Sequence, residues 1–277
     1  MTTPLRPLST GELLDTTFSL YRSHFVLFVG LVAVPYLIIL PFQVLSVTIQ
    51  PTGFHFSLTS VGLLLAITLA VLVASAASQG ATLIAVSHVY LGRPATVTGA
   101  LSRIRGRVLG LSALNLVMGL GVMVGLVLLI VPGVIFAAMW SLAVPVAVLE
   151  DEPIFDAMSR SVRLTEGSRL RILLVYVLFI VITWIVSILF SLPVGVVTFM
   201  SMMRNGPNTV LPGWVQVFNI ASSFVTHCLV GPLMTIAFAV LYYDVRVRKE
   251  AFDLQLMMTA LDGAGAPAPD TPAGTNV

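Results

Sequence analysis

Charged residues are scarce in this chain and absent from most of its length. There are 14 basic and 12 acidic residues among 277, or 9%, whereas a soluble domain averages about 25%. None occurs in 24–92, 108–149, 172–203 or 205–243. About 20 apolar residues cross the hydrocarbon core of a bilayer, and each charge at its centre costs roughly 2.5–3.5 kcal/mol. The chain is therefore predicted to be a polytopic membrane protein rather than a soluble one.

Cysteine pairs, metal motifs and phosphate-binding loops are also missing. The single cysteine, Cys228, excludes an intrachain disulfide, and the four histidines show neither i, i+3 nor i, i+4 spacing. No Asp or Glu lies within a charge-free stretch, which counts against a proton-driven or sodium-driven pump. We therefore expect no catalytic residues, no metal and no cofactor. The net charge of +2 is too small to indicate nucleic acid as a partner.

The charge-free stretches predict an all-α membrane bundle of about six transmembrane helices. They form a single integral membrane domain, residues 1–261, followed by a Gly/Ala/Pro-rich tail, 262–277, that is predicted to be disordered. Pro35 and Pro41 predict a bent first span, and Pro132-Gly133 is expected to separate the third span from the fourth. The predicted spans are 24–48, 58–91, 110–131, 134–149, 172–192 and 214–243.

Basic residues fall in every second connection, and this alternation predicts the orientation. Thirteen of the 14 lie in 1–23, 92–107, 150–171 and 244–277, and only Arg204 lies elsewhere. Lys and Arg are enriched in cytoplasmic connections. We therefore expect a multi-pass protein of a bacterial cytoplasmic (inner) membrane, with both termini in the cytoplasm.

The first cytoplasmic segment has the pattern of an amphipathic helix. Ser9 and Glu12 have capping-box spacing, and Leu14, Phe18 and Tyr21 recur on one face. Such a helix lies at the membrane interface, with its apolar side toward acyl chains or protein.

Two later segments, 97–107 and 154–166, have the same character. In the second of them, Phe155, Met158 and Val162 share one face. The sequence therefore predicts three amphipathic cytoplasmic interfacial helices, each leading into a span.

Uncharged polar residues interrupt the apolar runs in two groups, one in the second and third spans and one in the sixth. Each group can line a cavity, or it can join helices by hydrogen bonds of about 0.6 kcal/mol each. The second role is the commoner one in membrane proteins, and it is the one we expect here. The groups are Ser75, Ser78, Gln79 and Asn115, and Asn219, Ser223, Thr226 and His227.

Seven arginines of the cytoplasmic segments are the candidate contact residues. Each can attract an anionic lipid headgroup by about 1 kcal/mol, although orientation of the chain alone needs the same charges. The expected partners are membrane lipids and a protein of unknown identity. The arginines are Arg103, Arg105, Arg107, Arg160, Arg163, Arg169 and Arg171.

Three blocks of the sequence carry a family resemblance. They are Gly-Glu-Leu-Leu-Asp at 11–15, Ala-Met-Ser-Arg-Ser at 157–161 and Leu-Tyr-Tyr-Asp-Val-Arg at 241–246. Together they resemble the bacterial membrane domain that precedes a glycerophosphoryl diester phosphodiesterase in some proteins. The resemblance spans about residues 5–256 and implies a membrane domain with no assigned catalytic residues. The phosphodiesterase barrel itself, typically about 250 residues, has no counterpart here.

These features favour a non-catalytic accessory or scaffold domain that contacts lipids or a protein partner. A passive transporter or lipid-translocating protein is the alternative, and an enzyme acting on lipid headgroups is the third. A sealed apolar bundle would favour the scaffold, and a continuous polar groove would favour the transporter. Converging His, Asp or Glu at the cytoplasmic face would favour the enzyme.

Overall fold

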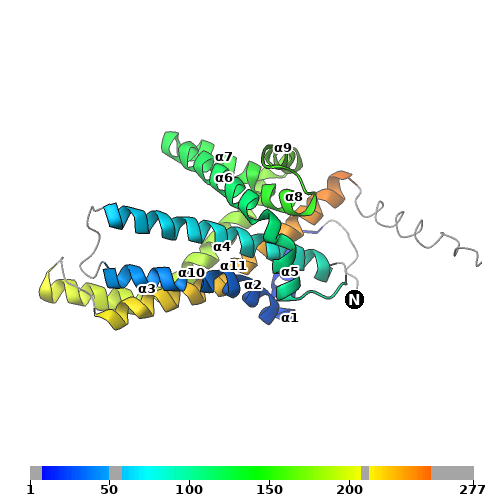
Figure 1. Cartoon of the computed structure of the whole chain (residues 1–277). Helices are drawn as coiled ribbons and strands as arrows, with labels where there is room; N and C mark the ends of the chain where they lie inside the picture. Colours follow the sequence, from blue (N-terminus) through cyan, green and yellow to red (C-terminus); the bar gives the residue numbers. More distant parts are fainter. Residues whose placement is uncertain (1–7, 50–57, 91, 207–211, 251–277) are drawn as a thin grey trace, which may run out of the picture.

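The computed structural model describes residues 8–49, 58–90, 92–206 and 212–250. Most of these residues are helical, and no strand occurs among them (Figure 1). The tail predicted for 262–277 lies outside the described residues.

Five helical segments are long and apolar enough to cross a membrane, and a sixth is obtained from a bent pair of helices. That pair is α1 (Thr10–Ser23) and α2 (Phe25–Leu37), which meet at 79°. The predicted all-α membrane bundle is therefore confirmed, with five or six spans. The five segments are Ser60–Tyr90, Val97–Leu128, Ile130–Leu149, Arg169–Asn205 and Gly213–Glu250.

The first predicted span, 24–48, consists of two helices. The chain leaves α2 at Leu37 and resumes as α3 (Leu40–Ile49). Pro35 lies in the last turn of α2, and Pro41 lies in the first turn of α3. Proline removes a backbone donor and crowds the preceding turn, and the helix is interrupted at residues 38–39, between the two prolines. The bend expected from these prolines stays a prediction.

Three helices are longer than the hydrocarbon core requires. These are α4 (Leu58–Tyr90), α10 (Arg169–Asn205) and α11 (Gly213–Glu250). The 33 residues of α4 extend about 50 Å at 1.5 Å per residue, against about 30 Å for the core. Such helices project beyond the bilayer or tilt within it.

The third and fourth predicted spans form a tight hairpin. α6 (Val108–Leu128) is followed by a single residue, Leu129, whose backbone is extended with φ −163° and ψ 143°. α7 (Ile130–Trp140) begins at the next residue. The break was expected at Pro132-Gly133, so the prediction is wrong by three residues. Pro132 instead lies in the first turn of α7, where the backbone N–H needs no helical acceptor.

Small residues allow the two arms of this hairpin to approach closely. A Cβ on Gly125 would lie 2.8 Å from the Cα of Gly133, and a Cβ on Gly121 would lie 2.6 Å from the Trp140 ring. The small-xxx-small spacing of Gly121 and Gly125 therefore packs α6 against α7 within one chain, as such spacing commonly does between membrane helices.

The charged connections fold as helices. α5 (Val97–Ile104) continues through a single 3₁₀ turn, η1 (Arg105–Arg107), into α6. α8 (Ala143–Leu149) follows α7 after an interruption at Ser141 and Leu142, and α9 (Ile154–Thr165) packs on α7 and α8. The three predicted amphipathic segments are thus helical, and the Ser9–Glu12 capping box is present in α1.

In two of these helices, part of the predicted apolar face packs on the core, as Leu14, Tyr21 and Met158 do, and part is exposed. α1 buries Leu13 and Thr17, whereas Phe18 is exposed, and α9 buries Ala157 and Leu164 while Phe155 is 75% exposed. Small side chains on α9 permit close packing on the bundle, so its large apolar side chains point outward. The outward position of Phe155 leaves it available to acyl chains.

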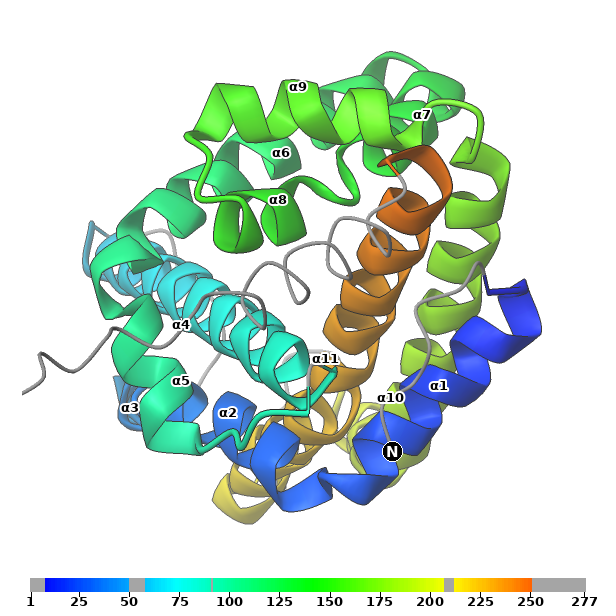
Figure 2. The ribbon, with the colours of Figure 1, turned by 90° about the vertical axis from the view of Figure 1, so that its right-hand side faces the viewer.

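The charged end of α11 lies at the centre of the packing. From Ile236 to Val247 almost every side chain of α11 is buried. α11 contacts α1, α2, α4 and α10, and Figure 2 shows it between α4 and α10. This helix therefore positions the polar groups that are described next.

The tight α6–α7 hairpin predicts that two glycine-to-alanine substitutions on α6 change the stability of the protein differently. Gly125→Ala should lower the free energy of unfolding by about 1–3 kcal/mol, because its Cβ meets the Gly133 backbone. Gly119→Ala on the same helix meets nothing within 4 Å and should be neutral or stabilising, since alanine favours helix. Denaturant unfolding of the detergent-solubilised protein measures both. Equal effects of the two alanines would contradict the tight hairpin.

Candidate functional site

A cavity of about 640 Å³ lies inside the bundle. Its walls are parts of α2, α4, α6, α7, α8, α10 and α11, together with Ser141 between α7 and α8. Small-molecule sites in proteins occupy about 300–1,000 Å³, so the space is large enough for a ligand. The bundle is therefore not sealed and solid.

The cavity is buried at one end and open at the other. Ser78 and Thr82 of α4 are 5% and 1% exposed. Ser191 of α10 and Asn219 and Ser223 of α11 also line the cavity, and they are exposed. Because α11 carries its charged residues at the opposite end from Asn219, the open end of the cavity lies away from the charged end of the bundle.

An amide pair bridges two walls of the cavity. The Asn115 amide of α6 donates from Nδ2 to Oε1 of Gln79 on α4, at 3.5 Å. Both residues line the cavity. The pair joins two helices, as such groups commonly do, and it also presents amide groups to the empty space.

Two hydroxyls on α4 are buried without a hydrogen bond to any described residue. They are Oγ of Ser78 and Oγ1 of Thr82, one helical turn apart. By contrast, Ser75 and Thr183 donate to carbonyls of their own helices, at 2.9 Å and 2.7 Å. A buried hydroxyl without a partner costs about 1–3 kcal/mol, so these two oxygens leave hydrogen-bonding capacity unused in residues that line the cavity.

Aromatic rings line another part of the same cavity. The His227 ring of α11 stacks on the Tyr36 ring of α2, with centroids 5.0 Å apart and an interplanar angle of 25°. The stack gives this part of the wall a flat aromatic surface.

The cavity unites the two polar groups that the sequence placed in separate spans. All eight residues of those groups line it. The expected role in joining helices is met by Gln79 and Asn115, whereas Ser78 contributes a free hydroxyl instead. No sequence signal indicated that the two groups meet, because their residues lie more than 100 positions apart.

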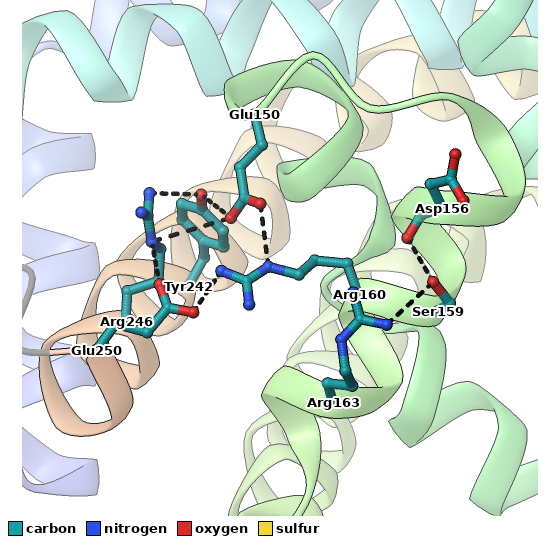
Figure 3. Close-up of polar contacts among 8 residues, drawn as sticks. All are labelled: Glu150, Asp156, Ser159, Arg160, Arg163, Tyr242, Arg246 and Glu250. Carbon is teal, nitrogen blue, oxygen red and sulfur yellow. Dashed lines mark hydrogen bonds and ion pairs between the residues drawn. The ribbon is translucent and has the colours of Figure 1, made fainter.

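A network of charged side chains lies beyond the cavity, at the end of α11 (Figure 3). Arg160 of α9 donates from Nε to Glu150 Oε2 at 3.1 Å and from Nη2 to Glu250 Oε1. Tyr242 donates its hydroxyl proton to Glu150 Oε1 at 2.8 Å, and Arg246 donates to the Tyr242 oxygen at 3.0 Å. Arg246 also pairs with Glu250 at 3.0 Å. We call these five residues the Glu150 network.

The Glu150 network is largely shielded from solvent. Its arginine and glutamate side chains are only 16–24% exposed. Burial disfavours the charged form of Arg160, but its hydrogen bonds to Glu150 and Glu250 outweigh burial and hold the pKa of Arg160 above its ordinary value. Arg160 therefore stays protonated, and the network joins α9 to α11 and to the end of α8.

A second network surrounds a buried carboxylate. Asp244 of α11, with a side chain 0% exposed, accepts from Arg171 Nη1 at 2.6 Å and from Arg248 Nε at 3.0 Å. It also accepts from the backbone N–H of Leu8 at 2.6 Å, and the Leu8 carbonyl accepts from Arg171 at 2.8 Å. This Asp244 network joins the chain before α1 to α10 and α11.

Three of the seven candidate arginines are paired with carboxylates in the structure. Arg160 belongs to the Glu150 network and Arg171 to the Asp244 network. Arg107 lies 2.6 Å from Asp151, and both side chains are largely exposed. An arginine that is buried against a carboxylate offers little charge to a lipid headgroup, so Arg160 and Arg171 are not available contacts.

The other four candidate arginines do not converge on one site. Arg103 lies 3.2 Å from Nε2 of His88, and Arg105 is exposed. Arg163 is exposed and points to Ser159, away from the Glu150 network. Arg169 buries its Nε without a hydrogen bond to the described residues. The exposed members remain predicted headgroup contacts.

The sequence reasoning missed the partners of these arginines. Glu150 does not cap α9, which has Pro153 at its N-cap without a side-chain cap bond. Tyr242 and Asp244 stand in the sequence only within the block at 241–246, and nothing there assigns them a partner. Their concentration beside a transmembrane helix was the available signal, since charges near an apolar interior need partners.

The described residues contain no group of three or more His, Cys, Asp or Glu side chains that could hold a metal ion. Three carboxylates, those of Glu150, Asp244 and Glu250, lie in the two networks and pair with arginines and a tyrosine. The candidate site is therefore the uncharged cavity, with the two ionic networks beyond it.

The fold and the cavity define an α-helical membrane bundle with an internal polar space. The chain belongs to the DUF7847 family, described as a domain of unknown function, whose model matches residues 51–245. No curated protein and no solved structure matches the chain.

The Glu150 network yields a stability prediction. Arg160→Ala removes one of the two arginines that pair with Glu150 and Glu250, and should lower the free energy of unfolding by about 1–3 kcal/mol. Arg163→Ala, on the same helix, removes an exposed side chain with one 3.5 Å contact and should change it by less than about 0.5 kcal/mol. Thermal unfolding in detergent compares them. A loss for Arg163→Ala as large as that for Arg160→Ala would refute the structural role of the network.

Proposed function

We propose that the protein is a passive membrane carrier or lipid-translocating protein, and that the cavity receives the molecule it moves. The single observation behind this proposal is the space of about 640 Å³ inside an apolar bundle, with uncharged polar side chains among its lining residues. Side chains around an empty space lose packing contacts. A protein that only held partners together would be more stable with this space filled.

The chemistry of the walls supports passive movement over ion-coupled transport. The residues that line the cavity include no Asp or Glu, and such carboxylates bind the coupling ion in pumps. The buried carboxylate of Asp244 is held by two arginines and a backbone N–H. The proposal also includes no catalytic turnover, in keeping with the proposed kinship to the membrane domain of the glycerophosphoryl diester phosphodiesterase type.

We further propose that the charged end of the bundle faces the cytoplasm of a bacterial cell and that the cavity opens toward the opposite side. The distribution of basic residues supports this orientation. Exposed Arg103, Arg105 and Arg163 are then the residues that meet anionic headgroups.

The orientation predicts which single cysteines react with an impermeant maleimide. In a Cys228→Ala background, Arg204→Cys should be labelled in spheroplasts, whereas Arg103→Cys should be labelled only after permeabilisation. Both arginines are exposed in the structure, so access to the reagent depends on the side of the membrane. Labelling of Arg103→Cys without labelling of Arg204→Cys would reverse the orientation.

A variant that fills the cavity tests the carrier function. Gly119 lines the cavity, and a Cβ there meets nothing within 4 Å, so Gly119→Phe should place its ring in the empty space. Gly110→Phe, on the same helix and outside the cavity lining, is the matched control. In proteoliposomes, we expect Gly119→Phe to reduce flux at least tenfold and Gly110→Phe to leave it unchanged.

Two readouts cover lipids and small solutes in this test. Dithionite quenching of a fluorescent phospholipid reports translocation between leaflets, and stopped-flow osmotic swelling reports the entry of a small polyol. Protein-dependent flux in either assay that Gly119→Phe blocks supports the proposal. Absence of flux in both assays for the unmodified protein would reject it and favour the scaffold.

A further inference from the structure

We infer that the cavity selects an amphipathic lipid whose head is uncharged and carries a hydroxyl, and that it discriminates against the same lipid bearing a phosphate. This inference rests on the proposed function in one respect, namely that the cavity is a binding site. It does not require that the bound molecule crosses the membrane.

The walls of the cavity dictate an uncharged head. No Lys or Arg is among the lining residues. The buried cations near the end of α11, such as Arg171 and Arg246, are already hydrogen-bonded to carboxylates. A phosphate moved from water into this space would lose its hydration without gaining a cation, which is strongly unfavourable. A hydroxyl loses far less and can recover its hydrogen bonds.

The buried end of the cavity has the groups that a hydroxyl needs. Ser78 and Thr82 line it from one face of α4, and their hydroxyl oxygens are buried without a hydrogen bond to the described residues. Gln79 and Asn115 share one 3.5 Å hydrogen bond, and each amide has both donor and acceptor groups. A ligand hydroxyl both donates and accepts, so it can contact the amide pair and offer a partner to the two buried oxygens when their side chains rotate toward the cavity.

The rest of the lining suits an acyl chain. Met118 and Val122 of α6 and Phe190 of α10 form apolar parts of the wall. Val122 and Phe190 are partly exposed, and the neighbouring Met123 and Leu189 are largely exposed, as are side chains that meet lipid tails in a membrane. The head therefore sits at α4 and α6, and the chain extends toward the lipid-facing surface.

The test compares two lipids that differ only in the phosphate, namely diacylglycerol and phosphatidic acid with identical dibrominated acyl chains. Trp140 lines the cavity, whereas Trp184 and Trp214 are exposed. In a Trp184→Phe, Trp214→Phe background in nanodiscs, bromine quenching of Trp140 reports occupancy above a brominated phosphatidylcholine baseline. We expect diacylglycerol to reach half-maximal quenching at a mole fraction at least tenfold below that of phosphatidic acid.

Two threonines on α4 provide matched variants. Thr82→Val removes the unpartnered hydroxyl while keeping the shape of the side chain, and it should weaken diacylglycerol quenching at least fivefold. Thr68→Val is the control, because the Thr68 hydroxyl is exposed and donates to the Leu64 carbonyl at 2.8 Å. Thr82→Val fills no new volume and leaves no polar group unpaired, so loss of folding does not account for the change.

The outcomes separate the inference from the carrier proposal. Selective diacylglycerol quenching without flux would reject the carrier and leave the ligand assignment intact. Flux together with equal or tighter binding of phosphatidic acid would overturn the assignment and leave the carrier intact. Quenching of Trp140 by neither lipid, or equal weakening by Thr82→Val and Thr68→Val, would also overturn the assignment.

Discussion

The buried carboxylate of Asp244 determines how the parts of this bundle fit together. It accepts hydrogen bonds from the backbone before α1, from Arg171 on α10 and from Arg248 on its own helix. A carboxylate away from water is tolerated only when such partners surround it. Because each partner comes from a different element, α10, α11 and the chain at Leu8, before α1, hold a fixed position relative to one another. The apolar core around Phe28, Phe179 and Tyr242 packs within that frame.

The same cost of desolvating charge accounts for the contrast between the two polar regions. At one end, carboxylates and guanidinium groups neutralise each other in the Glu150 and Asp244 networks. Inside the bundle, uncharged polar groups share the lining of the cavity with apolar and aromatic side chains, and no Asp, Glu, Lys or Arg is among them. The first region stabilises the arrangement of the helices, and the second leaves hydrogen-bonding groups unused. The cavity, not the arginines, is therefore the feature with the capacity to bind.

Much of the fold could be predicted from the sequence, because long charge-free runs leave few alternatives to membrane helices. The capping box at Ser9 and the interruption of the first span between Pro35 and Pro41 follow from local geometry and were predictable. The buried faces of α1 and α9 were not, because a pattern of large apolar residues cannot distinguish a face that meets lipid from one that meets protein. On α9, small Ala157 marks the protein side, whereas Phe155 marks the exposed one.

The candidate site was predictable only in its parts. The sequence identified Gln79 and His227 as polar residues within spans, but their meeting depends on how α4 and α11 pack. It also identified Arg160 and Arg171 but not their carboxylate partners. Glu250 lies 90 residues from Arg160, and Asp244 lies 73 residues from Arg171. Sequence periodicity carries information about one helix at a time, whereas both the cavity and the ionic networks arise between helices.

The hydrogen bond between Leu8 and Asp244 has a consequence for synthesis of the protein. Its two ends are 236 residues apart, so at about 5–20 residues per second the Leu8 N–H waits roughly 12–47 s for its acceptor to be made. Arg171 is made before Asp244 as well, and it too awaits this carboxylate. The spans before Asp244 are therefore made before Leu8 can bind this carboxylate. Formation of the Asp244 network is a late step in the assembly of the bundle.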